Sequence, residues 1–185
     1  MSHINKAIDI LNNGGIILYP TETVWGIGCL ANNIQAIDKI YKIKNRSKSK
    51  KFILLIGDDN KLNRYVNEVP EIAWELIDSS YKQPTIIYPK AKNLPEILLE
   101  TDQSIAIRVI NSGPLQQFLK KLDFPLISTS ANLSNDFPPK SLKEVSKEIL
   151  TKVDFVLDLP EIKGSKHPSS IIKLQTNGEV EIVRK

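Results

Sequence analysis

The sequence predicts an α/β protein built on a mixed β-sheet. Amphipathic helical segments alternate with short apolar strands early in the chain, and strands cluster near its C-terminal end. Regular alternation alone would indicate a purely parallel sheet, so the late cluster of strands favours a sheet that also has antiparallel neighbours. The 185 residues fit one domain with a sizeable core, and no linker or repeat divides them. We therefore expect a single domain over residues 1–185.

In the N-terminal half, the expected elements follow from apolar spacing and from turn residues. Apolar residues three or four positions apart predict helices over residues 4–11, 33–43 and 70–77. The first helix should end at Gly14-Gly15, because glycine readily terminates a helix. Short runs of Ile, Leu and aromatic residues predict buried strands over residues 16–19, 52–56 and 84–88.

In the C-terminal half, residues 104–110 alternate, with Ile105, Ile107 and Val109 on one face and Arg108 on the other, which predicts a strand. The capping-box pattern Ser141-Leu-Lys-Glu144 predicts a helix from there to about residue 150. A short helix is expected over residues 113–121, and strands over 125–128, 153–157, 170–174 and 180–183. The sequence Asn177-Gly178 indicates a hairpin between the last two strands.

Composition excludes several classes of protein. Hydrophobic residues at 41% and charged residues at 25% are typical of a globular chain rather than a disordered one. One cysteine, Cys29, excludes an internal disulfide framework and a Cys-x-x-Cys zinc site, and the acidic residues and two histidines form no metal-binding set. No apolar run approaches the ~20 residues of a membrane-spanning helix, and the N-terminus lacks a secretory signal pattern. We expect a cytoplasmic protein with no protein-held metal and no membrane contact.

The distribution of charge is more informative than its total. The net charge is only +4, yet the segment Lys42–Lys51 holds six cations and no acid. Such a run is compatible with a solvated surface, with a nucleic-acid patch or with a site for a phosphate-rich small ligand. It contains no aromatic residue that could stack on bases, so it does not decide between these possibilities.

Four polar segments lie where expected strands begin or end, the usual place for sites in α/β sheets. They are Tyr19–Gly28, the basic run Lys42–Lys51, Ser128–Ser134 and residues 167–170. The glycines of the first segment match neither a dinucleotide-binding nor a P-loop pattern, and the segment could be a simple turn. The hydroxyls of the third can donate to phosphate or carboxylate oxygens, although a plain loop is the commoner interpretation. No nucleophile is paired with a base. Cations and hydroxyls without a nucleophile suit an anionic, nucleotide-like ligand and no covalent enzyme intermediate.

Six segments, taken together and in order, resemble the YrdC family. They are Tyr-Pro-Thr-Glu-Thr-Val-Trp-Gly-Ile-Gly (19–28), Lys44-Asn-Arg46 with Lys50, Pro84-Thr85, Ser104-Ile-Ala-Ile-Arg108-Val, Ser128-Thr-Ser-Ala-Asn132 and Pro168-Ser-Ser-Ile-Ile172. The resemblance covers essentially the whole chain and is to the short, single-domain bacterial members. It implies a twisted mixed sheet with flanking helices around a positively charged cavity.

The resemblance also implies an activity. Members of this type are L-threonylcarbamoyladenylate synthases, nucleotidyltransferases that make threonylcarbamoyl-AMP and pyrophosphate from L-threonine, bicarbonate and ATP. Their product feeds the threonylcarbamoyladenosine modification of tRNA, so a functional hand-off to tRNA threonylcarbamoyl transferase proteins is expected. Mg²⁺ is expected to arrive with ATP, bridging its phosphates.

Roles for individual residues follow from the same resemblance. The catalytic residues would be Lys44, Arg46 and Lys50, whose charges would offset the charge that develops at phosphorus. The ATP-binding residues would be Arg46, Lys50, Ser104, Asn132, Lys140 and Arg184. The threonine-binding residues would be Thr23, Arg108, Ser128, Ser130 and Ser169, with Arg108 suited to a bidentate grip on the carboxylate.

The chain departs from the family pattern at four places. The loop Tyr81-Lys-Gln-Pro84 differs from the usual Trp-Pro-Gly-Pro, and Ser47 replaces a usual Pro. Ser134-Asn135 replaces Ser-Gly, so a turn with positive φ would depend on Asn135, a residue that tolerates it. Lys173 stands where an Asp is frequent.

Two other functions remain open at this point. The main alternative is a module of the same fold that binds double-stranded RNA or tRNA without making the adenylate, and weak RNA binding is compatible with either function. A second possibility is a paralogue that uses another acyl acceptor.

Overall fold

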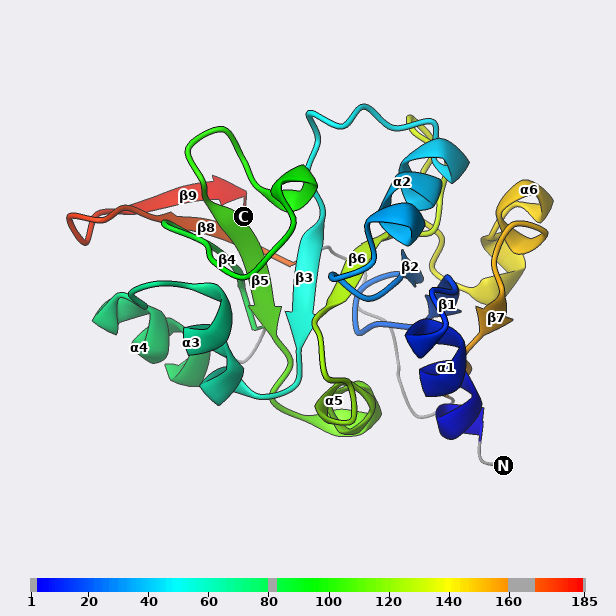
Figure 1. Cartoon of the computed structure of the whole chain (residues 1–185), viewed down its shortest axis with the longest axis horizontal. Coiled ribbons are helices and arrows are strands. Elements are labelled where there is room, and N and C mark those ends of the chain that lie inside the picture. Colours follow the sequence, from blue (N-terminus) through cyan, green and yellow to red (C-terminus); the bar gives the residue numbers. More distant parts are fainter. Residues whose placement is uncertain (1–2, 80–82, 160–168, 185) are drawn as a thin grey trace.

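The computed structural model of the chain describes residues 3–79, 83–159 and 169–184, which form a sheet of nine strands with helices on both faces (Figure 1). Three neighbouring pairs are parallel (β1–β7, β3–β5 and β4–β8) and the other five described pairs are antiparallel. The predicted mixed sheet is confirmed. The strand order is β7 (Phe155–Val156), β1 (Ile17–Tyr19), β2 (Gly26–Gly28), β6 (Leu126–Ser130), β3 (Ile53–Ile56), β5 (Ile105–Val109), β4 (Thr85–Tyr88), β8 (Ile171–Leu174) and β9 (Val180–Arg184).

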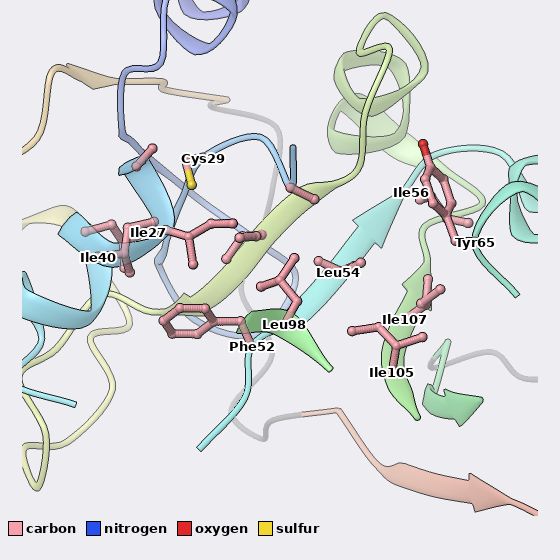
Figure 2. Close-up of a cluster of buried hydrophobic side chains, with 14 of the residues drawn as sticks. Ile27, Cys29, Ile40, Phe52, Leu54, Ile56, Tyr65, Leu98, Ile105 and Ile107 are labelled. Atoms are coloured by element: carbon pink, nitrogen blue, oxygen red, sulfur yellow. The ribbon is translucent and has the colours of Figure 1, made fainter. Parts of the chain in front are cut away.

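Each face of the sheet has its own apolar core. On β3, Leu54 and Ile56 belong to one core and Leu55 belongs to the other, because successive side chains of a strand point to opposite faces. The first core, part of which is drawn in Figure 2, is covered by α2 (Ile34–Ile43), α3 (Leu62–Tyr65), α4 (Glu71–Ser79) and α6 (Lys147–Leu150). The second is covered by α1 (His3–Asn12) and α5 (Gly113–Lys120). Within the described ranges, no helix has the length and apolar character needed to cross a membrane.

Most of the expected elements are present, but the segment after Tyr19 is not only a turn. It contains β2, a strand that pairs with β1 on one side and with β6 on the other. A Cβ at Gly28 would lie 1.9 Å from the carbonyl oxygen of Ile127, and a Cβ at Gly26 would touch the ring of Tyr19. These two glycines therefore allow close strand pairing and leave room for Tyr19.

The single helix expected from Ser141 to about residue 150 is wrong. The chain instead forms a 3₁₀ turn (Leu142–Glu144) and then the short helix α6. The Ser141 hydroxyl donates to the Glu144 carboxylate, but the Ser141 side chain accepts no backbone hydrogen bond and so does not cap a helix. Val145 is extended, and the Ser146 side chain accepts a hydrogen bond from the Ile149 amide to begin α6.

Two predicted turns are present. Asn135 adopts a φ of 78°, so an asparagine does occupy the left-handed position that the family usually gives to glycine. The β8–β9 hairpin turns at residues 175–178, with Gly178 at a φ of 85° and its amide donating to the Gln175 carbonyl. Tyr81 and Lys82 of the altered loop lie outside the described residues, as does His167.

The close approach of β2 to β6 predicts a large cost for a side chain at position 28. Gly28→Ala should lower the free energy of unfolding by more than about 2 kcal/mol, because the added methyl group must displace the Ile127 carbonyl. Chemical denaturation measures the loss, and Ile27→Val on the same strand, expected to cost about 0.5–1.5 kcal/mol, is the matched control. A Gly28→Ala midpoint equal to that of the wild type would contradict the strand geometry.

Candidate functional site

A cavity of about 370 Å³ lies on the sheet face that also carries α1 and α5. Leu126 of β6 packs into the core beneath these helices, whereas Ser128 and Ser130, on the same side of the same strand, line the cavity. In β5, Arg108 and Ala106 likewise line it. The helices thus cover the apolar part of this face and leave its polar part open to a ligand.

The cavity is predominantly cationic and rich in hydroxyl groups. Among the described residues, its wall holds four cationic side chains and one carboxylate, Glu100. The cations are Arg46, Lys51, Arg108 and Arg184. The hydroxyl groups come from Thr21, Thr23, Thr85, Ser104, Ser128, Thr129, Ser130 and Ser169. This composition favours a ligand with several negative charges.

The structure brings eight of the twelve predicted site residues to the cavity wall. These are Thr23, Arg46, Ser104, Arg108, Ser128, Ser130, Ser169 and Arg184. The four that do not line it are Lys44, Lys50, Asn132 and Lys140. The structure thus gives the location of all twelve residues, whereas their individual roles remain predictions.

Arg108 occupies the position that the alternation of β5 predicts. It is only 7% exposed, it lies opposite the apolar face of β5, and its Nε donates to the Gln83 carbonyl oxygen at 2.9 Å. Its Nη1 lies 3.6 Å from a carboxylate oxygen of Glu22. Burial lowers the pKa of Arg108 from its ordinary value, with Glu22 opposing that shift. Because this ion pair is loose, the guanidinium can donate hydrogen bonds to a second carboxylate, such as one that a substrate would supply.

Arg46 is positioned by the end of α2. Asn45 adopts a left-handed φ of 47°, and the Arg46 amide donates back to the Tyr41 carbonyl, which ends the helix and turns the chain toward the cavity. The guanidinium donates to the carbonyl oxygens of Lys50 and Lys51 and lies over the Phe52 ring, 5.5 Å from its centroid. Burial lowers the pKa of Arg46 from its ordinary value. These contacts hold the Arg46 guanidinium at the cavity wall, where Lys51 is the other lining residue of the basic run.

Lys44, predicted to be catalytic, does not line the cavity. Its side chain is 1% exposed, and its ammonium donates to the carbonyl oxygens of Ser130 at 2.5 Å and Asn132 at 2.6 Å. In return, the Ser134 amide donates to the Lys44 carbonyl. Burial, with a smaller contribution from Arg46, lowers the pKa of Lys44 to about 8. These hydrogen bonds link the C-terminal end of α2 to the end of β6 and to the segment after it, and the Lys44 ammonium does not line the cavity.

The other three residues outside the wall have distinct surroundings. The Asn132 amide nitrogen donates to the Leu133 and Asp136 carbonyls, and its Oδ1 is buried without a hydrogen bond, so Asn132 shapes the loop beside the cavity. Lys140 is exposed, and its backbone amide donates to Glu144. Lys50 is exposed as well, and its neighbour Lys51 lines the cavity instead. The spacing of the basic run gave no signal that would separate these two lysines.

At the far side of the cavity, hydrogen bonds join β4 and β9 to the segment that precedes β8. The Thr85 hydroxyl on β4 lies 2.9 Å from the Ser169 hydroxyl, and Arg184 on β9 donates through Nε and Nη2 to the Ser169 carbonyl. Thr85 is fully buried. It was not among the predicted site residues, although the Pro84-Thr85 motif indicated this segment. The hydroxyl of Thr21 similarly accepts from the Thr23 and Val24 amides, which folds the turn that brings Thr23 to the wall.

The described side chains of the cavity do not form a site that could hold a metal ion. Within residues 3–79, 83–159 and 169–184, no three His, Cys, Asp or Glu side chains gather in a way that could bind one. The only carboxylate among the described lining residues is Glu100, and it stands among cations and hydroxyls. A divalent cation would find its ligands on a bound polyphosphate rather than on these side chains.

Comparisons with known proteins agree with this geometry. The family model Sua5/YciO/YrdC, described as telomere recombination, matches residues 9–185. The chain is similar to the threonylcarbamoyl-AMP synthase of Pseudoalteromonas translucida, with 36% identity over 182 residues that cover 97% of this chain and 96% of that protein.

Two solved structures have the same fold over nearly the whole chain. One is E. coli YciO, with a TM-score of 0.80 and 28% identity, covering 98% of this chain and 88% of that one. The other is P. abyssi Sua5 complexed with L-threonine, with a TM-score of 0.80 and 25% identity, covering 94% of this chain and 52% of that one. The chain thus spans about half the length of that Sua5 structure.

The contacts of Lys44 predict a structural contribution that an exposed lysine lacks. Lys44→Met leaves two carbonyl oxygens without their donor, so it should lower the free energy of unfolding by about 1–3 kcal/mol. Lys50→Met, at an exposed position, should change it by less than about 0.5 kcal/mol. Equal stability of the two variants would contradict the contacts of Lys44.

The unfolding free energies of the wild type and of Lys44→Met should depend differently on pH. Burial lowers the pKa of Lys44 from 10.5 to about 8, so between these values the unfolded chain binds the proton that the folded chain has released. The native state therefore gains stability as the pH rises through this window, and Lys44→Met lacks that gain. The difference in unfolding free energy between wild type and Lys44→Met should widen from pH 8 to 10.5, and a constant difference would argue against a depressed pKa.

Proposed function

The chain belongs to the Sua5/YciO/YrdC family, and on that premise we propose that it forms threonylcarbamoyl-AMP and pyrophosphate from L-threonine, bicarbonate and ATP. The observation that carries the proposal is the cationic, hydroxyl-lined cavity with a buried arginine at its wall. Full-length relatives named threonylcarbamoyl-AMP synthase support it, and so does the threonine complex of P. abyssi Sua5. The alternative of an RNA-binding module without catalysis is not favoured, because these relatives are named as enzymes.

The chemistry requires positioning and positive charge more than a reactive side chain. The threonine amine condenses with bicarbonate to give a carbamate and water, and a carbamate oxygen then attacks the α-phosphorus of ATP and displaces pyrophosphate. The nucleophile is an anion that approaches a polyanion, so cations held close to the reacting atoms lower the barrier. This scheme uses no covalent enzyme intermediate, and among the described lining residues the hydroxyl groups are accompanied by no histidine or cysteine.

We assign the two charged substrates to different cations. Arg108, beside Ser128 and Thr23 in the cavity wall, would bind the threonine carboxylate, because a guanidinium can form two parallel hydrogen bonds with it. Arg46 and Lys51 would bind the triphosphate, with Arg184 at the far side of the cavity. Mg²⁺ is part of the nucleotide substrate in this scheme and is held by its phosphates.

The product would be used in the cytoplasm by tRNA threonylcarbamoyl transferase proteins. A mixed anhydride of a carbamate and a phosphate hydrolyses readily, so a prompt hand-off to such a protein serves the chemistry. Transfer to tRNA should therefore require these partners in addition to this chain.

The reaction itself gives the first test. Purified protein with ATP, threonine and bicarbonate should release pyrophosphate and form an acyl-adenylate that mass spectrometry detects. Omission of threonine should abolish the release. Release that continues at the same rate without threonine or bicarbonate would overturn the proposed function.

The assignment of the cations gives a second test. Arg108→Ala should weaken threonine binding by roughly tenfold to a hundredfold and leave ATP affinity, measured by calorimetry without threonine, within about a factor of ten. Arg46→Ala should weaken ATP by a similar factor and spare threonine, and Arg46→Lys should rescue it incompletely because lysine lacks the planar fork. Arg64→Ala, at an exposed arginine outside the cavity wall, is the matched control. The assignment is wrong if Arg108→Ala and Arg46→Ala impair the same substrate.

A further inference from the structure

The last strand, β9, is an exposed edge of the sheet. Within the described residues it pairs only with β8, and all five of its residues are exposed. Of the six large hydrophobic side chains that are exposed in the described part of the chain, β9 carries three: Val180 at 47%, Ile182 at 60% and Val183 at 50%. Figure 1 shows the β8–β9 hairpin reaching outward at one end of the sheet. An exposed apolar edge offers unpaired backbone N–H and C=O groups to a further strand.

One face of β9 continues the first apolar core to the edge of the sheet. Val180 lies opposite Leu174 and Ile182 lies opposite Ile172, so the members of each pair share a face. Leu174 is buried in the first core, and Ile172 packs against that core. The apolar surface therefore extends past β8 and ends, exposed, at Val180 and Ile182. A neighbouring strand on this edge would remove these two side chains from water.

The other face of β9 carries one acid and one base. Glu181 lies opposite Lys173, and Arg184 lies opposite Ile171. Lys173 and Ile171 are two positions apart on β8 and share a face, so Glu181 and Arg184 share that face too. A shift in the register of β8 and β9 makes this possible, because Val183 is an extra residue on β9. The strand thus presents a carboxylate toward its start and a guanidinium toward its end.

We propose that β9 pairs antiparallel with β9 of a second copy of this chain, which gives a dimer with one sheet running through both copies. Glu181 and Arg184 are placed symmetrically about the middle of the strand, so a two-fold axis perpendicular to the sheet brings each Glu181 to Arg184 of the partner subunit. The same axis brings Ile182 to its counterpart on the apolar face. Parallel pairing loses both ion pairs, because it joins like ends of the two strands.

The opposite edge of the sheet is a poor partner for β9. The strand at that edge, β7, has only two residues, and both are half-buried. It is too short to pair along the five residues of β9. The charges and the extra residue of β9 also discourage pairing with an unmatched strand. A second β9 matches the apolar face, the charges and the length, and the resulting dimer is closed.

The proposed dimer reaches the wall of the cavity. Arg184 lines the cavity, and its Nε and Nη2 donate to the Ser169 carbonyl oxygen. A guanidinium has five N–H donors, so it can also donate to a carboxylate of the second copy. The partner subunit's Glu181 is then a positioning residue, because it gives the Arg184 guanidinium a further fixed contact beside the cavity.

Sedimentation velocity of the full chain at a series of concentrations tests the inference. The wild type should pass from monomer to dimer with a dissociation constant on the order of 10 μM, as expected for a small interface. Ile182→Lys should weaken association at least about tenfold, because the interface offers its ammonium no partner. Ile34→Lys, which replaces an isoleucine that is 53% exposed on α2, is the matched control and should keep the wild-type constant.

A charge exchange tests the orientation of the two strands. Glu181→Arg and Arg184→Glu should each weaken association by about tenfold, because each places like charges together twice in the dimer. The double variant, with both substitutions, should associate within about threefold of the wild type, since the ion pairs form again with their signs exchanged. Thermal unfolding followed by circular dichroism checks that each variant is folded.

Three outcomes would overturn the inference. The first is a wild type that stays monomeric at concentrations about tenfold above the expected dissociation constant. The second is a dimer that Ile182→Lys leaves intact, because its interface must then lie elsewhere. The third is a folded double variant that associates no better than the single variants, because antiparallel pairing of β9 requires the exchange to restore it. Each outcome would leave the proposed function intact.

Discussion

The buried ammonium of Lys44 joins the two segments on which the cavity depends. It binds the carbonyl oxygens of Ser130 and Asn132, while the Ser134 amide binds the carbonyl of Lys44 itself. One segment continues from α2 to Arg46, and the other begins with the hydroxyls of β6. A buried cation without hydrogen-bonded partners would be strongly destabilising, so its contacts fix the position of α2 relative to β6. The distance between Arg46 and the serines of β6 is therefore set by the fold and not by a flexible loop.

Positive charge at a partly desolvated wall gives this cavity its chemical character. Burial lowers the pKa of Arg46, Arg108 and Arg184, so each guanidinium has lost part of its hydration, and Arg108 has only a loose ion pair with Glu22 in return. In the proposed reaction, anionic substrates would pair with these guanidinium groups at a place where water is scarce and electrostatic interactions are strong. The same arrangement favours a transition state in which an anionic carbamate meets a triphosphate, because the compensating charges are already in place. Substrate binding and catalysis thus have a common physical origin.

The sequence was sufficient to predict what depends on local pattern. The alternation of residues 104–110 placed Arg108 opposite Ile105 and Ile107, and the order of six motifs indicated the family and its mixed sheet. The sequence was insufficient where tertiary contacts determine the local structure. The strand at Gly26–Gly28 forms because β1 and β6 pair with it on either side, and the capping box at Ser141 is interrupted because Val145 is extended. The sequence pattern does not distinguish Lys44, Lys50 and Lys51. Packing alone buries Lys44, leaves Lys50 exposed and places Lys51 at the cavity wall.

The central claim is that one cavity holds both substrates, with the amino acid on Arg108 and the nucleotide on the side of Arg46 and Ser104. A crystal structure of the chain with L-threonine and a non-hydrolysable ATP analogue tests it most directly. We expect the threonine carboxylate at the Arg108 guanidinium, the phosphates near Arg46, and Lys44 still bound to the carbonyls of Ser130 and Asn132. Threonine placed away from Arg108, or a nucleotide bound outside this cavity, would contradict it.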